Sequence, residues 1–172
     1  NTVSSDVFIV GAARTPVGSL QGTLASQTAP QLGAHAIAAA LSHADINASD
    51  VDEVVMGNVV SAGLKQAPAR QAMRQAKLPD SCGATTINKV CGSGMKAAMI
   101  ATDLIRAGSA DTVVAGGMES MSNAPYLLDK ARSGLRMGHT QMLDALFTDG
   151  LEDAETGGSM GSFAQNTADQ HQ

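Results

Sequence analysis

Four short apolar runs, separated by segments with helical spacing, set the fold class of this chain. The runs expected to be strands are residues 7–10, 51–60, 84–90 and 111–117. The first of them is apolar throughout, which is typical of a strand buried on both faces. Short connections in a strand–helix–strand order produce a largely parallel sheet with helices on its faces. We therefore predict an α/β fold with a βαβαβαβ core, whose ligand site lies at the carboxyl ends of the strands.

Cys91 stands where the third expected strand gives way to a helix, in the run NKVCGSGMK of residues 88–96. A thiol at a helix N-terminus faces the positive end of the helix dipole, which favours the reactive thiolate. The neighbouring glycines leave room for a ligand to approach the sulfur. We therefore predict that Cys91 is a covalent nucleophile.

Two other interpretations of this junction stay open. A free cysteine is often simply buried in the core. Residues 92–97 also match the dinucleotide-binding pattern G-x-G-x-x-A, with Asp111 about 20 residues further on. That pattern requires its acidic residue at the end of the second strand, whereas Asp111 opens the next strand. The placement of Asp111 therefore counts against a dinucleotide site.

The expected helix after Cys91 has almost no polar side before Thr102 and Asp103, and it ends at Gly108. A helix that is apolar all round is usually buried on all sides. We therefore expect the nucleophile helix to lie inside the protein.

Composition narrows the classes of partner. The net charge of −5 argues against nucleic acid or an anionic membrane surface, and no apolar run approaches the ~18 residues of a membrane span. The aromatic share is only 2% within 44% hydrophobic residues, so the core must be aliphatic. Cys82 and Cys91 form no disulfide framework, and the four histidines are scattered. We expect a reducing compartment and no metal site.

The pattern changes after Met118, and we place a domain boundary there: a core domain over residues 1–122 and a loop domain beginning at residues 123–172. Basic residues gather at the start of the second part. They are Lys130, Arg132, Arg136 and His139. A solvated loop and a surface that attracts a phosphorylated ligand are both compatible with this cluster.

Five segments together resemble the thiolase family. The run around Cys91 is similar to the active-site signature of thiolases. Four further segments match in the same order: GAARTPVG at 11–18, VVMGNV at 54–59, APARQ at 67–71 and AGGMESMS at 115–122. The resemblance covers nearly the whole chain and is strongest to the short-chain thiolases.

This resemblance implies a reversible Claisen condensation of two acetyl-CoA to acetoacetyl-CoA and CoA through an acetyl-Cys91 intermediate. Coenzyme A enters as part of the substrate, so no separate cofactor is implied. The backbone N–H of Cys91 would help to stabilise the oxyanion. Leu151 would contact CoA, and Met160 would line the acyl pocket, although a core methionine at a helix start is the alternative. Ser159 stands where short-chain relatives often carry His.

The resemblance also implies partners that these 172 residues lack. Thiolases use a His from a G-H-P motif and a second Cys from a C-x-G-G-G motif, and neither motif occurs here. We therefore expect this chain to be the N-terminal half of the enzyme, inactive in isolation. Relatives are homo-oligomers, either dimers or tetramers, and residues 67–70 and 84–90 resemble parts of their dimer interface. Bacterial cytoplasm is the expected compartment, with the mitochondrial matrix as the alternative.

Three other functions remain open. The chain could belong to a degradative 3-ketoacyl-CoA thiolase of broader chain length. It could also belong to a decarboxylating condensing enzyme, which would use a malonyl thioester as its extender. The third is a non-catalytic fragment that binds CoA or a partner chain without becoming acetylated.

Overall fold

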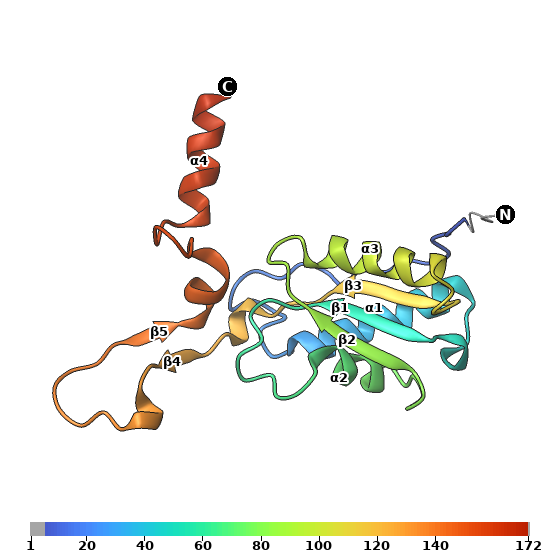
Figure 1. The fold of residues 1–172 in the computed structure, drawn as a ribbon, viewed down its shortest axis with the longest axis horizontal. Coiled ribbons are helices and arrows are strands. Elements are labelled where there is room, and N and C mark those ends of the chain that lie inside the picture. Colours follow the sequence, from blue (N-terminus) through green and yellow to red (C-terminus); the bar gives the residue numbers. More distant parts are fainter. Residues whose placement is uncertain (1–5, 172) are drawn as a thin grey trace. The chain divides into compact units, whose positions relative to one another are not determined.

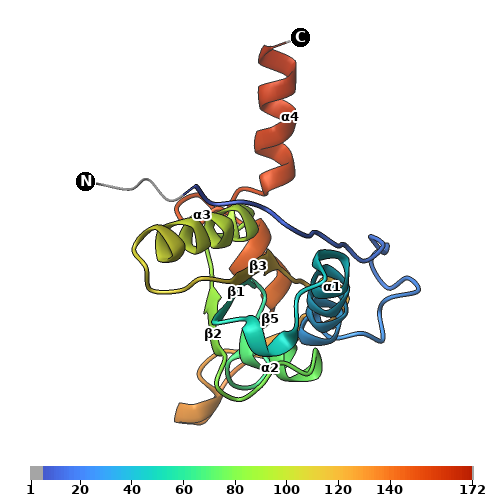
Figure 2. The ribbon, with the colours of Figure 1, turned by 90° about the vertical axis from the view of Figure 1, so that its right-hand side faces the viewer.

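The computed structural model describes residues 6–171, and the chain divides into two compact units between Asn123 and Ala124. In the first unit a small sheet has helix α3 (Ser93–Arg106) on one face. Helices α1 (Ala29–Ala44) and α2 (Pro68–Gln75) cover the other face (Figures 1 and 2). The first unit is therefore an α/β sandwich of three layers, as predicted.

The sheet consists of three parallel strands: β1 (Glu53–Gly57), β2 (Gly83–Ile87) and β3 (Val113–Gly117). Their order is β2-β1-β3, with β1 in the centre. Gly57 pairs with Ile87 on one side and with Gly117 on the other. All three strands therefore end at the same level, and the residues that follow them meet at one edge of the sheet.

Local signals explain where the helices begin. The Thr28 side chain accepts a hydrogen bond from the Gln31 N–H, and the Gln31 side chain accepts one from the Thr28 N–H. This reciprocal cap satisfies two of the N–H groups that an α-helix leaves free at its start. Pro30 in the first turn of α1 and Pro68 at the start of α2 occupy positions where the missing N–H costs nothing.

The core between the sheet and helices α1 and α2 is aliphatic, as the composition predicted. It is built around large side chains with at most 8% exposure: Ile37, Leu41, Val54, Met56 and Met73. Each such side chain stabilises the fold by roughly 1.5–3 kcal/mol through burial. This layer therefore fixes β1 as the central strand.

The expected strand over residues 7–10 does not form. These residues pair with no strand of the described chain, and Phe8, Ile9 and Val10 are 75%, 91% and 62% exposed. The chain is held here by α1 instead, since the Ala12 N–H donates to Nδ1 of His43 at 3.2 Å. An apolar sequence supplies no hydrogen-bonding neighbour by itself. The sheet consequently has three strands where four were expected.

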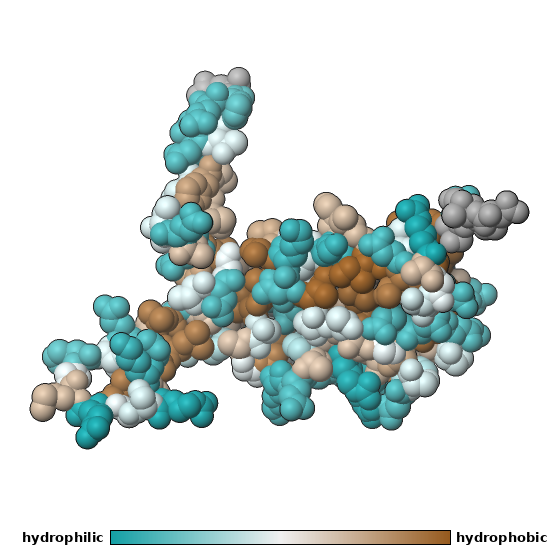
Figure 3. Space-filling model, in the orientation of Figure 1, coloured by the Kyte–Doolittle hydropathy of each residue, from teal (hydrophilic) through white to brown (hydrophobic). Residues whose placement is uncertain are grey.

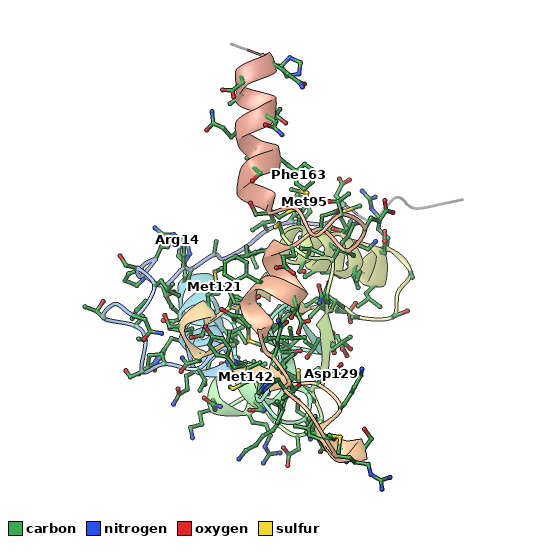
Figure 4. The ribbon with its side chains drawn as sticks, turned by 90° about the vertical axis from the view of Figure 1, so that its left-hand side faces the viewer. Arg14, Met95, Met121, Asp129, Met142 and Phe163 are labelled. Atoms are coloured by element: carbon green, nitrogen blue, oxygen red, sulfur yellow. The ribbon has the colours of Figure 1, made fainter. Side chains whose placement is uncertain are left out.

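Helix α3 is also less buried than expected. Ser93, Ala97 and Ala101 face the protein interior, but Met95 (labelled in Figure 4) is 75% exposed and Met99 is 54% exposed. The small residues allow close contact with the sheet, which covers only one side of the helix. The full burial that an apolar circumference predicts would require a second covering layer.

Figure 3 shows hydrophobic residues on this face of the first unit, in the region where α3 and β3 lie in Figure 1. β3 is an edge strand, since it pairs with β1 alone. An unpaired apolar edge can template pairing with another strand. The outer edge of β3 is therefore free to form backbone hydrogen bonds with another strand.

The second unit begins with an antiparallel hairpin of β4 (Tyr126–Leu128) and β5 (Met142–Asp144). The connection between these strands carries the four basic residues noted above. A π-helical turn (Phe147–Leu151) and helix α4 (Met160–Gln170) follow. Over residues 6–171, the structure contains no helix with the length and hydrophobicity needed to span a bilayer.

Candidate active site

Cys91 lies in the turn between β2 and α3, at the carboxyl edge of the three parallel strands. Its residue is exposed, whereas Cys82 is buried at 2%. Ligands of open α/β sheets bind at this edge. Cys91 therefore lies at the edge of the sheet that the sequence predicted, and the residue is exposed.

The residue before the nucleophile has an unusual backbone conformation. Val90 has a φ of +46°, in the left-handed region. This region costs an L-residue about 1–2 kcal/mol, and a β-branched side chain is rarely found there. The left-handed turn lets the chain reverse direction between β2 and α3, directly before Cys91.

Hydrogen bonds from both sides hold this turn. The Val90 N–H donates to Oδ1 of Asn88 at 2.9 Å. The Val90 carbonyl accepts from the Ser93 hydroxyl at 2.6 Å and from the Ser93 N–H at 3.1 Å. The same hydroxyl accepts the Lys89 N–H at 2.8 Å. Ser93, which is buried at 4% exposure, therefore links the two residues that precede Cys91.

Glycines at the strand ends allow α3 to approach the sheet. A Cβ on Gly57 would lie 2.5 Å from the Cβ of Ser93, closer than real Cβ atoms come. A Cβ on Gly117 would lie 3.5 Å from the Cα of Gly94. The first turn of α3 thus rests directly on the ends of β1 and β3. This contact explains the glycine at position 57, where a Cβ has no room.

The structure also shows a polar pair, buried Asn58 and half-buried Glu119, that was not among the predicted site residues. Asn58 follows β1 and is 2% exposed, and its Nδ2 donates to Oε1 of Glu119 at 2.8 Å. The Glu119 carboxylate also accepts the N–H groups of Val59 at 2.9 Å and Val60 at 3.2 Å. Desolvation raises the pKa of Glu119, although the hydrogen bonds from Val59 and Val60 act in the opposite direction.

The sequence carried a signal for Glu119 alone, which follows the expected strand 111–117; Asn58 fell inside the expected strand 51–60, so the sequence did not reveal the pair. Each comes one or two residues after a parallel strand, where polar side chains from neighbouring strands meet. Oδ1 of Asn58 is buried and has no hydrogen-bond partner among the described residues. The pair joins the ends of β1 and β3 at the edge that also carries Cys91.

Helix α3 begins without a side-chain cap, and Gly92 occupies its N-cap position. The N–H groups of the first helical turn have no acceptor within their own helix. Together with the positive end of the dipole, such groups stabilise negative charge. An exposed thiol beside them can form a covalent bond to a carbonyl carbon while the oxygen gains negative charge.

Leu151, Ser159 and Met160 lie in the second unit, where an antiparallel bridge between Glu152 and Ser159 brings their two segments together. Leu151 ends the π-helical turn. Ser159 is the N-cap of α4, since its Oγ accepts the Ser162 N–H at 3.2 Å. Met160 is the first residue of that helix and is 37% exposed. The three predicted contact residues thus form one group, and Cys91 belongs to the other unit.

One cavity of ≈ 300 Å³ lies at the opposite end of the strands. Asp52 and Glu53 line it from the start of β1, and Ile100 and Leu104 line it from the second half of α3. It does not include Cys91. In the described part of the chain, no group of three or more His, Cys, Asp or Glu side chains could hold a metal ion.

Comparisons with known proteins match this geometry to one family. The family model for the thiolase N-terminal domain matches residues 7–172. The chain is 52% identical to acetyl-CoA acetyltransferase of Schizosaccharomyces pombe, over 98% of this chain and 43% of the relative. Its identity to acetyl-CoA acetyltransferase of Escherichia coli K12 is also 52%, over 95% of this chain and 42% of the relative.

A solved structure gives the same result. The crystal structure of Acat5 thiolase from Ascaris suum in complex with coenzyme A matches with a TM-score of 0.92 and 40% identity. The match covers 97% of this chain and 43% of that chain. The chain therefore spans less than half the length of the relatives that it matches.

Proposed function

This chain belongs to the thiolase family, and we propose that it supplies the nucleophile of an acyl transfer between coenzyme A thioesters. The observation that carries the proposal is the position of Cys91, exposed in the turn before α3 at the carboxyl edge of the sheet. A thiol in this position has both access for an acyl group and oriented N–H groups beside it.

In the proposed first step, the Cys91 thiolate attacks the carbonyl carbon of acetyl-CoA. A new C–S bond forms to Cys91, the bond to the CoA sulfur breaks, and CoA leaves as a thiolate that takes up a proton. In the second step, a general base removes an α-proton from another acetyl-CoA, and the resulting carbanion attacks the carbonyl carbon of the acetyl group. The bond from that carbon to the Cys91 sulfur breaks, which yields acetoacetyl-CoA and releases Cys91 as a thiolate. The covalent intermediate divides one difficult reaction into two easier ones.

Acetyl-CoA is the proposed substrate because the relatives at about 50% identity are named acetyl-CoA acetyltransferases. In the second unit, Leu151 is the proposed contact to CoA, and Met160 is the proposed wall of the acyl pocket. The partial exposure of Met160 supports this role, since a core methionine would be covered. The Ser159 side chain caps α4, so its proposed contribution is to place Met160.

We further propose a homo-oligomer, either a dimer or a tetramer, in the bacterial cytoplasm or the mitochondrial matrix. The outer edge of β2 is unpaired in the described chain, which supports strand pairing between copies. Light scattering on the purified protein measures the number of subunits directly. Two free cysteines, one of them exposed, support a reducing compartment.

Intact mass spectrometry after incubation with acetyl-CoA tests the proposed function. We expect a gain of one acetyl group per chain, mapped to Cys91 by peptide analysis. Cys91→Ser and prior alkylation of Cys91 should each abolish the gain. Binding of CoA without any acetylation would overturn the proposal in favour of a non-catalytic CoA-binding fragment.

A further inference from the structure

Val90 and Ser93 are joined by hydrogen bonds in the turn that carries Cys91. Val90 has the left-handed conformation that turns the chain between β2 and α3, and its side chain is 48% exposed. No packing of that side chain explains the conformation. The stabilising interactions are the hydrogen bonds to the backbone of Val90.

Ser93 is the centre of these hydrogen bonds. Its hydroxyl donates to the Val90 carbonyl at 2.6 Å and accepts from the Lys89 N–H at 2.8 Å, so both of its bonds go to the two residues before Cys91. Its position is fixed in turn by burial at 4% exposure and by close contact with Gly57. Contact with the end of β1 therefore fixes the position of Ser93, and the Ser93 hydroxyl in turn binds the backbone of Lys89 and Val90.

We propose that Ser93 is a positioning residue, which fixes the direction of the Cys91 side chain by holding Val90 in its left-handed conformation. This proposal rests on the proposed function, because it concerns the reactivity of the same thiol. Without the hydroxyl, Val90 relaxes toward a negative φ, and the turn no longer directs Cys91 toward an incoming thioester. Glycine at position 90 adopts a positive φ without steric cost, so it should not need the hydroxyl.

The test compares four forms of the chain: wild type, Ser93→Ala, Val90→Gly and the double variant. The rates of acetylation by acetyl-CoA and of alkylation by iodoacetamide at Cys91 are measured by mass spectrometry. We expect Ser93→Ala to slow acetylation about tenfold, which equals about 1.4 kcal/mol. We expect the double variant to react within about threefold of Val90→Gly alone, since the two changes act on one element and are not additive.

Two results with folded variants would overturn the proposal. One is a wild-type rate for folded Ser93→Ala. The other is an equal loss from Ser93→Ala in both backgrounds, which would show a general packing role that the conformation of Val90 does not mediate. If Ser93→Ala does not fold, recovery of folding in the double variant supports the proposal, and failure of both forms overturns it.

The design separates this inference from the proposed function. If acetyl-CoA does not acetylate the wild-type chain, the proposed function fails. The alkylation rates of the four forms still decide the role of Ser93. Asn88→Ala provides a matched variant from the other side of the turn, since Asn88 is exposed and accepts the Val90 N–H at 2.9 Å. Its effect on alkylation should also disappear when residue 90 is glycine.

Discussion

Gly57 and Ser93 lie so close that no side chain fits between them: a Cβ on Gly57 would come within 2.5 Å of the Cβ of Ser93. Gly57 ends the central strand, and Ser93 begins α3. The short distance between the sheet and helix α3 is therefore possible only because residue 57 has no Cβ. Any side chain at position 57 must move the helix start or distort the strand.

Gly57→Ala should destabilise the protein by about 1–3 kcal/mol, because an inserted methyl group overpacks a tight contact. It should also slow alkylation of Cys91, since the displaced helix start carries the turn with it. Urea denaturation measures the first effect and mass spectrometry the second. Gly94→Ala is the matched control, because its added Cβ would meet its nearest neighbour at 3.7 Å, an ordinary contact. A Gly57→Ala protein as stable as Gly94→Ala would contradict the prediction.

Glu119→Gln should change how stability depends on pH. Burial raises the pKa of Glu119 above its ordinary value of 4.5. Its contribution to the free energy of unfolding is therefore fully present below pH 4.5 and is lost as the pH rises through the folded-state pKa. Glutamine does not titrate, so the free energy of unfolding of wild type minus that of the variant should decrease as the pH rises above 4.5. Urea unfolding at a series of pH values measures this difference.

Asp52→Asn is the control for that experiment, because the pKa of Asp52 is shifted in the opposite direction. Hydrogen bonds from the N–H groups of Thr112 and Asp111 lower the pKa of Asp52 below its ordinary value of 3.8. The stabilisation that Asp52 contributes is present above pH 3.8 and is lost as the pH falls through the folded-state pKa. The free energy of unfolding of wild type minus that of Asp52→Asn should therefore decrease as the pH is lowered. If the two differences in unfolding free energy changed with pH in the same direction, the raised pKa would not belong to Glu119.

The two cysteines should react at very different rates in the folded chain. Cys91 is exposed, whereas Cys82 is buried and its pKa is raised by desolvation and by the charges of Glu53 and Asp52. Both effects reduce the amount of accessible thiolate at position 82. Iodoacetamide at pH 7.5 should label Cys91 at least about tenfold faster, as mass mapping would show. In strong denaturant the rates should converge, and a persistent difference there would point to a local sequence effect.

The 172-residue chain alone should accept an acetyl group but should not turn over acetoacetyl-CoA. The residues contain neither a His-Pro pair nor a third cysteine. By the family resemblance, the missing His activates the nucleophile and the missing Cys removes the α-proton of the second acetyl-CoA. A general acid or base contributes typically 10²–10⁴-fold to a rate. The measurement is the loss of acetoacetyl-CoA absorbance with added CoA. Cys91→Ser gives the background rate, and turnover well above that background would contradict the expectation.

The sequence predicted those parts of the fold that depend on local patterns. Short apolar runs located β1, β2 and β3. The junction at Cys91 was identified because a strand, several glycines and a helix follow one another without a linker. Each of these features depends on neighbouring residues, so a single sequence contains the information.

Features that depend on a spatial neighbour could not be found in this way. The run over residues 7–10 has the composition of a strand, but no described strand lies beside it. The pair of Asn58 and Glu119 joins residues 61 positions apart, and only the common level of the strand ends brings them together. The left-handed conformation of Val90 contradicts the preference of valine, so it follows from the hydrogen bonds of Ser93 and Asn88.

Phe8, Ile9 and Val10 have a practical consequence for work with this chain. They are three large apolar residues exposed on a segment that no described strand pairs. Stretches of this kind are captured by chaperones and by other copies of the same molecule. Yield in a recombinant host will therefore depend on which of these partners reaches the stretch first, and lower growth temperature or co-expressed chaperones should favour recovery of soluble material.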